Sequence, residues 1–296
     1  MMRIGLDVGG TKTEAILINN NGAKIFSKRI PTEKNYEGTI EGIVRLINEI
    51  NNKFSEIDSI GIGMPGAISL ETSLIKSANS VWMNGKPLKS DLEKILKKNI
   101  KVENDANCFT LSEAVDGAGK NYSVVCGVII GTGTGSGIVI DKKIHKGKNR
   151  AAGEFGHNAL PRSSDEEVNL VNKCYCGLKG CIETFLSGPG FASIFNNINK
   201  TNLKSEEIVE LHKKQDARAL QALQDYCDRL ARSLSDIINV LDPDIIVLGG
   251  GMSNIDYIYP NVNQKLNKYV FSDVVKTKVV KNVHGDSGGV RGAAWL

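Results

Sequence analysis

The sequence lacks the features of several protein classes. It has no apolar run of the roughly 18 residues that a membrane span needs, and it has no dense arginine tract. Lysine and arginine number 37 against 33 aspartates and glutamates, a small surplus spread along the chain. The first residues lead straight into an expected strand without a signal-peptide pattern. We therefore expect no nucleic-acid partner, no membrane partner and a cytoplasmic location.

Histidine and cysteine are scarce, with 4 and 6 residues in a chain of 296. In a reducing compartment the cysteines are not expected to form disulfides. Three of them have apolar neighbours typical of buried thiols, namely Cys108, Cys126 and Cys227. The other three share one short stretch of chain with a histidine, and chemistry is to be sought there.

This stretch carries the pattern C-x-C-x4-C with an upstream histidine, a complete tetrahedral ligand set for zinc. Four protein ligands leave no open position, so the metal could not activate water. The sequence therefore predicts a structural Zn²⁺ that holds Glu154 and Glu183, near the two ends of the stretch, in place. The predicted ligands are His157, Cys174, Cys176 and Cys181.

Length and composition favour two α/β lobes. Hydrophobic residues make up 41% and charged residues 24%, an ordinary globular composition. We expect a small lobe over residues 1–117, with a C-terminal helix 286–296 packing back on it, and a large lobe over 118–285 that carries the zinc site.

Periodicity assigns the main elements of both lobes. A strand, a glycine turn and a second strand occur twice, which suggests two lobes of one plan whose turns face a shared cleft. Expected strands are 2–8, 14–19, 24–30, 57–64, 100–103, 123–130, 138–141 and 245–248. Expected helices are 39–51, 88–98, 106–116 (capped by Asn104 and Asp105), 217–241 and 288–295.

Three glycine-rich turns follow apolar strands, at residues 9–11, 131–137 and 249–251. Backbone amides without side chains suit the phosphates of a large anionic ligand, although tight turns required by the fold would explain each one singly. No Walker A loop is present, and Ser136 breaks the G-x-G-x-x-G pattern. Asp7 precedes the first turn and could hold a hydrated Mg²⁺, or serve as a turn residue.

Asp105 lies at a strand-to-helix junction, where it would be held rigidly. It is the best candidate for the carboxylate that accepts a proton in phosphoryl transfer, the alternative being a helix cap. A further set of amide, carboxylate and imidazole groups suits the neighbouring hydroxyls of a polyol: Asn79, Asn104, Glu154, His157 and Glu183.

On these motifs the chain resembles the ROK family of sugar kinases and sugar-responsive repressors, within the two-lobed, actin-like (ribonuclease H-like), hexokinase-type ATPase fold. The resemblance rests on DVGGTKTE (7–14), GIGMPGAIS (61–69), ENDANC (103–108), GTGTGSG (131–137), GEFGH (153–157), CYCGLKGCIE (174–183) and DPDIIVLGGG (242–251). Inside the family it is most similar to bacterial fructokinases, also called mannokinases, through NSVWMNGKPL, SEAVDGAG and HGDSGGVRGAAWL, with N-acetylglucosamine kinases a near second.

The resemblance implies a role for each matched position, with Asp105 as the general base. The first phosphate loop would comprise Asp7, Gly9, Gly10, Thr11 and Lys12, and the second Gly131, Thr132, Gly133, Thr134 and Gly135. Gly249, Gly250 and Gly251 would lie near the adenosine. Sugar would be bound by Gly66, Asn79, Asn104, Asp105, Glu154, His157 and Glu183, and zinc by His157, Cys174, Cys176 and Cys181.

The resemblance thus implies a kinase that uses ATP and Mg²⁺ to phosphorylate the 6-hydroxyl of fructose, and by extension mannose, with N-acetylglucosamine and glucose as alternative substrates. It also implies a homodimer, because a dimer is usual among the relatives. A sugar-sensing repressor is the rival from another class, disfavoured because the first strand begins at residue 2 and leaves no room for a helix-turn-helix. A zinc-stabilised binding protein without catalysis is the third reading.

Overall fold

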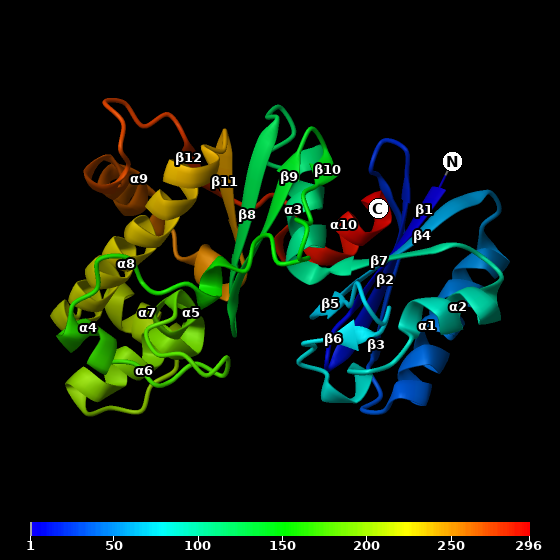
Figure 1. Cartoon of the computed structure of the whole chain (residues 1–296), viewed down its shortest axis with the longest axis horizontal. Helices are drawn as coiled ribbons and strands as arrows, with labels where there is room; N and C mark the ends of the chain where they lie inside the picture. Colours follow the sequence, from blue (N-terminus) through cyan, green and yellow to red (C-terminus); the bar gives the residue numbers. More distant parts are fainter. Residues whose placement is uncertain (1) are drawn as a thin grey trace. The chain divides into compact units, whose positions relative to one another are not determined.

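The structure, a computed structural model, describes residues 2–296 and divides into two compact units (Figure 1). The first unit comprises the chain up to Lys120 together with Lys142–Ala152 and Val283–Leu296, and the second comprises Asn121–Asp141 and Gly153–Asn282. The segment 142–152, expected in the large lobe, belongs to the first unit. One reason is that the Lys142 ammonium donates hydrogen bonds to backbone carbonyls of Ala114 and Lys120.

The first unit is built on a mixed sheet with strand order β3-β2-β1-β4-β7. The first three strands run antiparallel, as expected for a hairpin followed by a third strand, while β4 and β7 continue the sheet in parallel with β1. The strands are β1 (Met2–Val8), β2 (Lys12–Asn19), β3 (Lys24–Pro31), β4 (Ile57–Met64) and β7 (Ile100–Asn104).

Helices cover both faces of this sheet (Figure 1). One face packs against α1 (Tyr36–Lys53) and α2 (Leu88–Leu96), and the other against α3 (Asp105–Asp116) and α10 (Gly288–Trp295). The backbone of α10 approaches the sheet very closely. A Cβ at Gly61 would lie 1.9 Å from the carbonyl oxygen of Ala293, so only glycine admits the helix there.

The second unit repeats this plan. Its strands follow the order β9-β8-β11-β12, which matches β2-β1-β4-β7 in both succession and direction. They are β8 (Val124–Ile130), β9 (Thr134–Ile140), β11 (Ile245–Gly249) and β12 (Lys278–Lys281). The internal repetition expected from the two strand–turn–strand patterns is therefore present in the fold.

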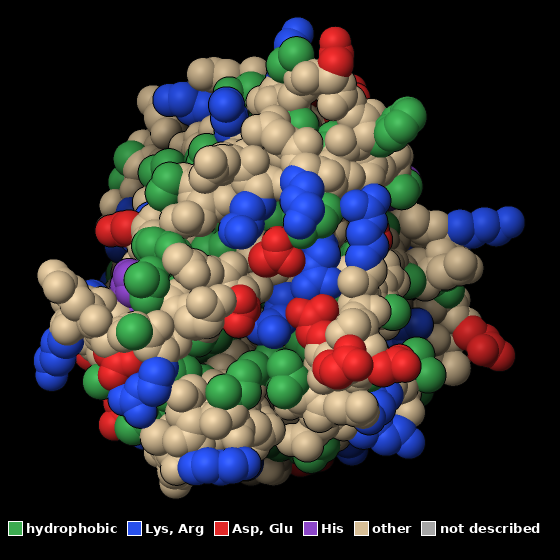
Figure 2. Space-filling view, turned by 90° about the vertical axis from the view of Figure 1, so that its left-hand side faces the viewer, with side chains coloured by type: hydrophobic (Ala, Val, Ile, Leu, Met, Phe, Trp, Pro, Cys, Tyr) green, Lys and Arg blue, Asp and Glu red, His purple; other side chains and the backbone are tan. Residues whose placement is uncertain are grey.

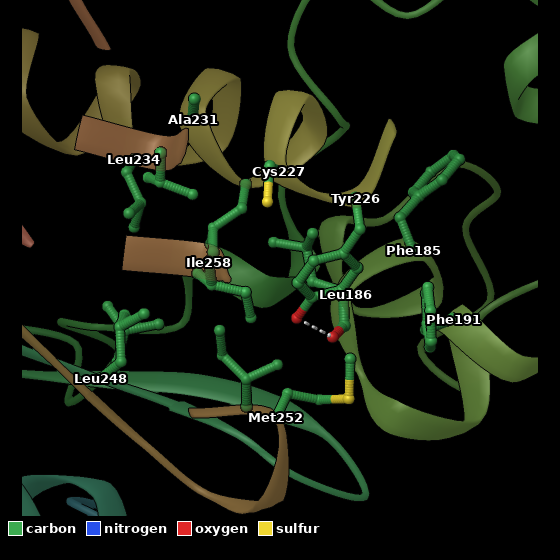
Figure 3. Close-up of a cluster of buried hydrophobic side chains, with 14 of the residues drawn as sticks. Phe185, Leu186, Phe191, Tyr226, Cys227, Ala231, Leu234, Leu248, Met252 and Ile258 are labelled. Carbon is green, nitrogen blue, oxygen red and sulfur yellow. Dashed lines mark hydrogen bonds between the residues drawn. The ribbon is translucent and has the colours of Figure 1, made fainter. Parts of the chain in front are cut away.

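Six helices complete the second unit, and a core of aromatic and aliphatic side chains joins five of them to the sheet (Figure 3). The long helix α8 contributes Tyr226, whose hydroxyl donates a hydrogen bond to the carbonyl of Leu186 at 2.8 Å. The helices are α4 (Asp165–Asn169), α5 (Ile182–Leu186), α6 (Gly188–Asn199), α7 (Ser205–Lys213), α8 (Ala217–Leu241) and α9 (Ile258–Tyr269).

Short elements fill the connections. Two-residue strands β5 (Ala67–Ile68) and β6 (Ile75–Lys76) form a small hairpin after β4, and β10 (Lys143–Ile144) follows β9 in the chain. Single 3₁₀ turns occur at Val81–Met83, Phe155–His157, Gly251–Asn254 and Gly285–Ser287. Across residues 2–296, no helix is both long and apolar enough to cross a membrane.

Several expected boundaries were wrong, and the structure gives a local reason for three of them. The helix expected over 88–98 ends at Leu96 because Lys97 adopts a left-handed conformation, with φ at 51°. The helix expected from Ala106 begins at Asp105, since the N-cap residue is Asn104. The strand expected from Ile138 begins at Thr134, because the Thr-Gly-Ser-Gly segment pairs with Gly127–Ile130 of β8. The second glycine turn is therefore confined to 131–133.

The face of the second unit formed by α8 and α9 carries charges of both signs, which gather near the middle of the view in Figure 2. A hollow of about 590 Å³ lies among them. Arg229 and Arg232 both form ion pairs with Glu167 at 2.7 Å beside the hollow. The charges around the hollow are therefore largely paired with one another. The lining residues are Glu167, Gln221, Gln224, Asp225, Asp228, Arg229, Asn261, Gln264 and Lys265.

Candidate active site

The first glycine turn joins β1 to β2 and is closed by a hydrogen bond from the Gly9 amide to the Lys12 carbonyl at 3.0 Å. Thr11 and Lys12 are exposed at this turn. Asp7 lies just before it on β1. Burial, reinforced by the nearby carboxylate of Asp105, raises the pKa of Asp7 to about 6. Asp7 and Asp105 therefore lie close enough to repel each other, as two carboxylates sharing one site do.

The junction between β7 and α3 orders three predicted residues. The side chain of Asn104 caps α3 by accepting hydrogen bonds from the amides of Ala106 (2.9 Å) and Asn107 (3.3 Å). Its amide group donates to the carbonyl of Gly66 at 3.1 Å. Asp105 is consequently the first residue of the helix, and the capping role that competed with the role of base belongs to Asn104.

Sequence reasoning missed an ion pair at this junction, between a largely covered carboxylate and a partly exposed lysine. Glu103 accepts hydrogen bonds from the Asn104 amide and the Asn107 side chain, both at 3.1 Å. Its other oxygen pairs with Lys146 at 2.5 Å. Lys146 lies 43 residues later in the chain, and no local pattern links the two positions. The pair fixes the backbone from which Asp105 projects.

Asn79 occupies an exposed position after the β5–β6 hairpin. The side chain of Asn84 holds Ala78, the residue before Asn79. It accepts a hydrogen bond from the backbone amide of Ala78 (2.8 Å) and donates one to its carbonyl (3.0 Å). The next residue, Ser80, is 6% exposed, and among the described residues its hydroxyl has no hydrogen-bond partner. That hydroxyl lies 3.2 Å from the place where a Cβ at Gly10 would be. Ser80 was not predicted.

The second and third glycine segments meet in the second unit. A Cβ at Gly250 would lie 2.5 Å from the carbonyl oxygen of Ile130 and 3.0 Å from the amide of Gly131. Gly250 has φ at 80°, so both its conformation and this close approach require glycine. Gly249 ends β11 and Gly251 opens the following 3₁₀ turn. The amide of Gly131 bonds to the carbonyl of Gly133 at 2.9 Å, which closes the second turn.

The four predicted zinc ligands converge. Their ligand atoms all lie within 4.8 Å of one another, and two pairs are 3.6 Å apart, Cys176 with Cys181 and Cys174 with the Nδ1 of His157. Zinc–sulfur bonds of about 2.3 Å in a tetrahedron place sulfurs roughly 3.8 Å apart. The three thiols and the imidazole therefore fit a tetrahedral Zn²⁺ in both chemistry and spacing.

The other ring nitrogen of His157, expected to face a sugar hydroxyl, has a protein partner in the structure. Its Nε2 lies 3.0 Å from the hydroxyl of Tyr175, and the two rings meet edge to face. Tyr175 lies between two of the cysteines and is 79% exposed. It is a further residue of this site that the sequence pattern did not single out.

The two predicted sugar-binding glutamates differ in their contacts. Glu154 is exposed. Glu183 is half-buried in the first turn of α5, where one carboxylate oxygen accepts a hydrogen bond from the amide of Thr134 at 2.9 Å. The loop carrying Glu154 packs on β9, since the carbonyl of Gly153 accepts hydrogen bonds from both the amide and the hydroxyl of Ser136.

Comparisons with known proteins agree with this architecture. The solved ROK hexokinase from Thermus thermophilus superimposes with a TM-score of 0.87 at 24% identity, covering 99% of this chain and 97% of that one. A ROK family glucokinase from Streptomyces griseus, solved with glucose and AMPPNP, gives a TM-score of 0.79 at 24% identity over 100% of this chain and 99% of that one. The fold is the α/β, actin-like fold of hexokinase type.

The sequence itself defines the family. Residues 3–296 match the ROK family, and the chain belongs to it. The N-acetyl-D-glucosamine kinase of Haemophilus influenzae is 38% identical over 300 residues, which span 100% of this chain and 99% of that protein. The resemblance expected from the motifs is therefore confirmed at the level of the family.

Proposed function

We propose that the protein is an ATP-dependent sugar kinase that transfers the γ-phosphoryl group of ATP to the 6-hydroxyl of N-acetyl-D-glucosamine. The observation that carries the choice of sugar is the 38% identity, end to end, with an N-acetyl-D-glucosamine kinase. The expectation of fructose gains no support from the named relatives. It rested on short motifs shared with fructokinases, and fructose stays an alternative substrate.

Asp105 supplies the base in this proposal. Its carboxylate accepts the proton of the 6-hydroxyl as the bond to phosphorus forms. The capped start of α3 and the Glu103–Lys146 pair behind it hold the carboxylate in one orientation. Asn104 contributes indirectly, because both ends of its side chain already bind the protein. Asn79, which is exposed, is better suited to contact sugar.

The glycine segments supply backbone N–H groups to the phosphates, and the exposed Lys12 adds a positive charge at the first turn. Asp7 would hold the hydrated magnesium that accompanies ATP. Magnesium neutralises charge that develops on the phosphates during transfer. The raised pKa of Asp7 fits this role, because a buried carboxylate next to another is stabilised by a cation.

The zinc site is proposed as a structural support for sugar recognition. His157, Cys174, Cys176 and Cys181 would hold the ion, and the closed ligand set leaves it no part in proton transfer. Its contribution is to fix His157 and the start of α5, from which Glu183 projects. A homodimer remains a prediction that sedimentation of the purified protein tests.

Coupled ADP release across fructose, mannose, glucose, N-acetylglucosamine and N-acetylmannosamine tests the proposal. We expect the largest kcat/KM with N-acetylglucosamine. A clear preference for fructose would instead restore the fructokinase assignment and leave the mechanism standing. Failure to release ADP with any of the five sugars would refute the kinase assignment and favour a binding protein.

A further inference from the structure

The carboxylate of Glu183 connects the predicted zinc loop to the second glycine turn. Its Oε2 accepts a hydrogen bond from the backbone amide of Thr134 at 2.9 Å, while its Oε1 lies 3.9 Å from the sulfur of Cys174. A Cβ at Gly133 would lie 2.7 Å from Oε2. Glycine at position 133 therefore leaves the space through which the carboxylate reaches the turn.

The helix that carries Glu183 is rigidly anchored. Phe185 and Leu186 of α5 are fully buried in the core of the second unit, and the hydroxyl of Tyr226 holds the Leu186 carbonyl (Figure 3). Directly after α5, the amide of Gly188 donates to the carbonyl of Gly131 at 2.8 Å. Side chain and backbone of this region thus hold the turn at both of its ends.

The bond to Thr134 determines how the turn presents its amides. A carboxylate bound to the Thr134 N–H fixes the orientation of the peptide between Gly133 and Thr134. The carbonyl of that same peptide accepts the hydrogen bond from Gly131 that closes the turn. Without the carboxylate, three glycines in five residues leave the turn many conformations.

We propose that Glu183 is a positioning residue for the phosphate-binding turn, and that it couples the sugar site to the nucleotide site. The inference rests on the proposed function, in which Glu183 also contacts sugar and residues 131–135 contact ATP. One oxygen would face the sugar while the other holds the turn. Sugar bound to the carboxylate then restrains the turn, so sugar and nucleotide strengthen each other's binding reciprocally.

Calorimetric titration of zinc-loaded protein with AMPPNP and magnesium, in the absence of sugar, separates this role from sugar contact alone. We expect Glu183→Ala to weaken nucleotide binding about tenfold, the scale of a lost hydrogen bond to a charged group. Glu183→Gln keeps a carbonyl acceptor for the Thr134 amide and is expected to stay within about threefold of the wild type. Unchanged nucleotide affinity in Glu183→Ala would overturn the inference.

Glu154→Ala is the matched control, because it removes the other predicted sugar-binding carboxylate, for which the described chain shows no bond to the turn. It should weaken sugar binding and leave nucleotide affinity without sugar unchanged. Gly133→Ala is a second variant, placed in the phosphate-binding turn itself, that leaves α5 and the cysteines intact, and its Cβ would displace the carboxylate. We expect the same loss of nucleotide affinity, and wild-type affinity there would also count against the inference.

The coupling itself is measured by repeating the AMPPNP titration with saturating N-acetylglucosamine. Sugar should tighten nucleotide binding in the wild type and have much less effect in Glu183→Ala. If the wild type releases no ADP with any hexose, the proposed function fails and this inference fails with it. If the wild type is an active kinase and Glu183→Ala binds AMPPNP normally without sugar, only this inference fails.

Discussion

The side-chain amide of Asn104 donates a hydrogen bond to the carbonyl of Gly66 at 3.1 Å, while its oxygen caps α3. The bond joins the turn after β4 to the junction that carries Asp105. Gly66 has φ at 80°, and a Cβ there would lie 2.4 Å from the carbonyl oxygen of Lys76. A single side chain therefore stabilises a helix end and fixes a glycine turn at the candidate sugar site.

These two functions of Asn104 can be separated by substitution. Asn104→Asp keeps the cap, since aspartate caps helices as well as asparagine does, but it cannot donate to Gly66. We expect a small change in Tm and a fall in kcat/KM of about tenfold. Asn104→Ala should lose about 1 kcal/mol of stability in addition. Equal activity of wild type and Asn104→Asp would show that the Gly66 bond is dispensable.

Replacing Asp7 by asparagine is predicted to have opposite effects on stability and on activity. Its folded pKa of about 6 lies above the ordinary value of 3.8, so the ionised form is disfavoured in the fold. The loss of folding stability caused by ionised Asp7 is absent below about pH 4, grows between pH 4 and 6, and is complete above pH 6. Asp7→Asn should therefore raise the metal-free Tm at pH 8, by the equivalent of roughly 2 to 3 kcal/mol.

The same variant should be almost inactive, because the amide cannot hold magnesium. In the wild type without nucleotide, magnesium affinity should fall as the pH drops through 6, where Asp7 takes up a proton. Thermal melts and magnesium titrations at pH 5 and pH 8 check both points. A lower Tm of Asp7→Asn at pH 8 would contradict the assignment.

The hydroxyl of Ser80 is predicted to contact a bound ligand rather than to stabilise the free protein. Its buried hydroxyl has no hydrogen-bond partner among residues 2–296, an arrangement that costs about 1 to 3 kcal/mol. Ser80→Ala should therefore keep or raise Tm while kcat/KM falls about tenfold, because a ligand at the first glycine turn would lose its donor. Ser112→Ala is the control, since that buried hydroxyl already donates to the Phe109 carbonyl at 2.8 Å. A variant of Ser80 with a lower Tm and normal kcat/KM would indicate a structural role only.

Zinc removal tests the cluster of His157 and the three cysteines. Elemental analysis should find one zinc per chain, and Cys176→Ser should lower this content. Sugar affinity should fall as the zinc content falls. AMPPNP affinity without sugar should fall less, because zinc directly supports the loop of the cysteines and only indirectly supports the second glycine turn. Intact sugar affinity after complete removal of zinc would contradict the role given to the metal.

Much of the fold follows from the sequence because local patterns determine it. The alternating or continuous apolar runs of β1 and β4, and the 25-residue amphipathic pattern of α8, specify their elements without knowledge of the tertiary structure. The β5–β6 hairpin escaped notice because two-residue strands have no periodicity. The sequence places Thr134 in a turn. A glycine-rich segment has no strand pattern of its own, and the strand forms there only through its pairing with β8.

In the candidate site, too, local patterns indicate some residues, while others are defined only by tertiary contacts. The four candidate zinc ligands could be grouped from the sequence because their residue types and spacing are rare in this chain. The bond between Glu183 and Thr134 joins positions 49 residues apart, and the Glu103–Lys146 pair joins positions 43 apart. Contacts of this kind depend on how the chain folds back on itself, so residue order alone could not indicate them. Ser80 gave no signal, because an unpartnered hydroxyl is defined only by its surroundings.

The comparison of wild type with Asp105→Asn tests the central claim most directly. The amide is isosteric and can still accept the Ala106 hydrogen bond that Asp105 accepts at 2.9 Å, but it cannot take up a proton. Sugar-dependent ADP release should fall by at least about a hundredfold, while N-acetylglucosamine affinity and Tm stay near the wild-type values. Near-normal turnover of Asp105→Asn would contradict the account.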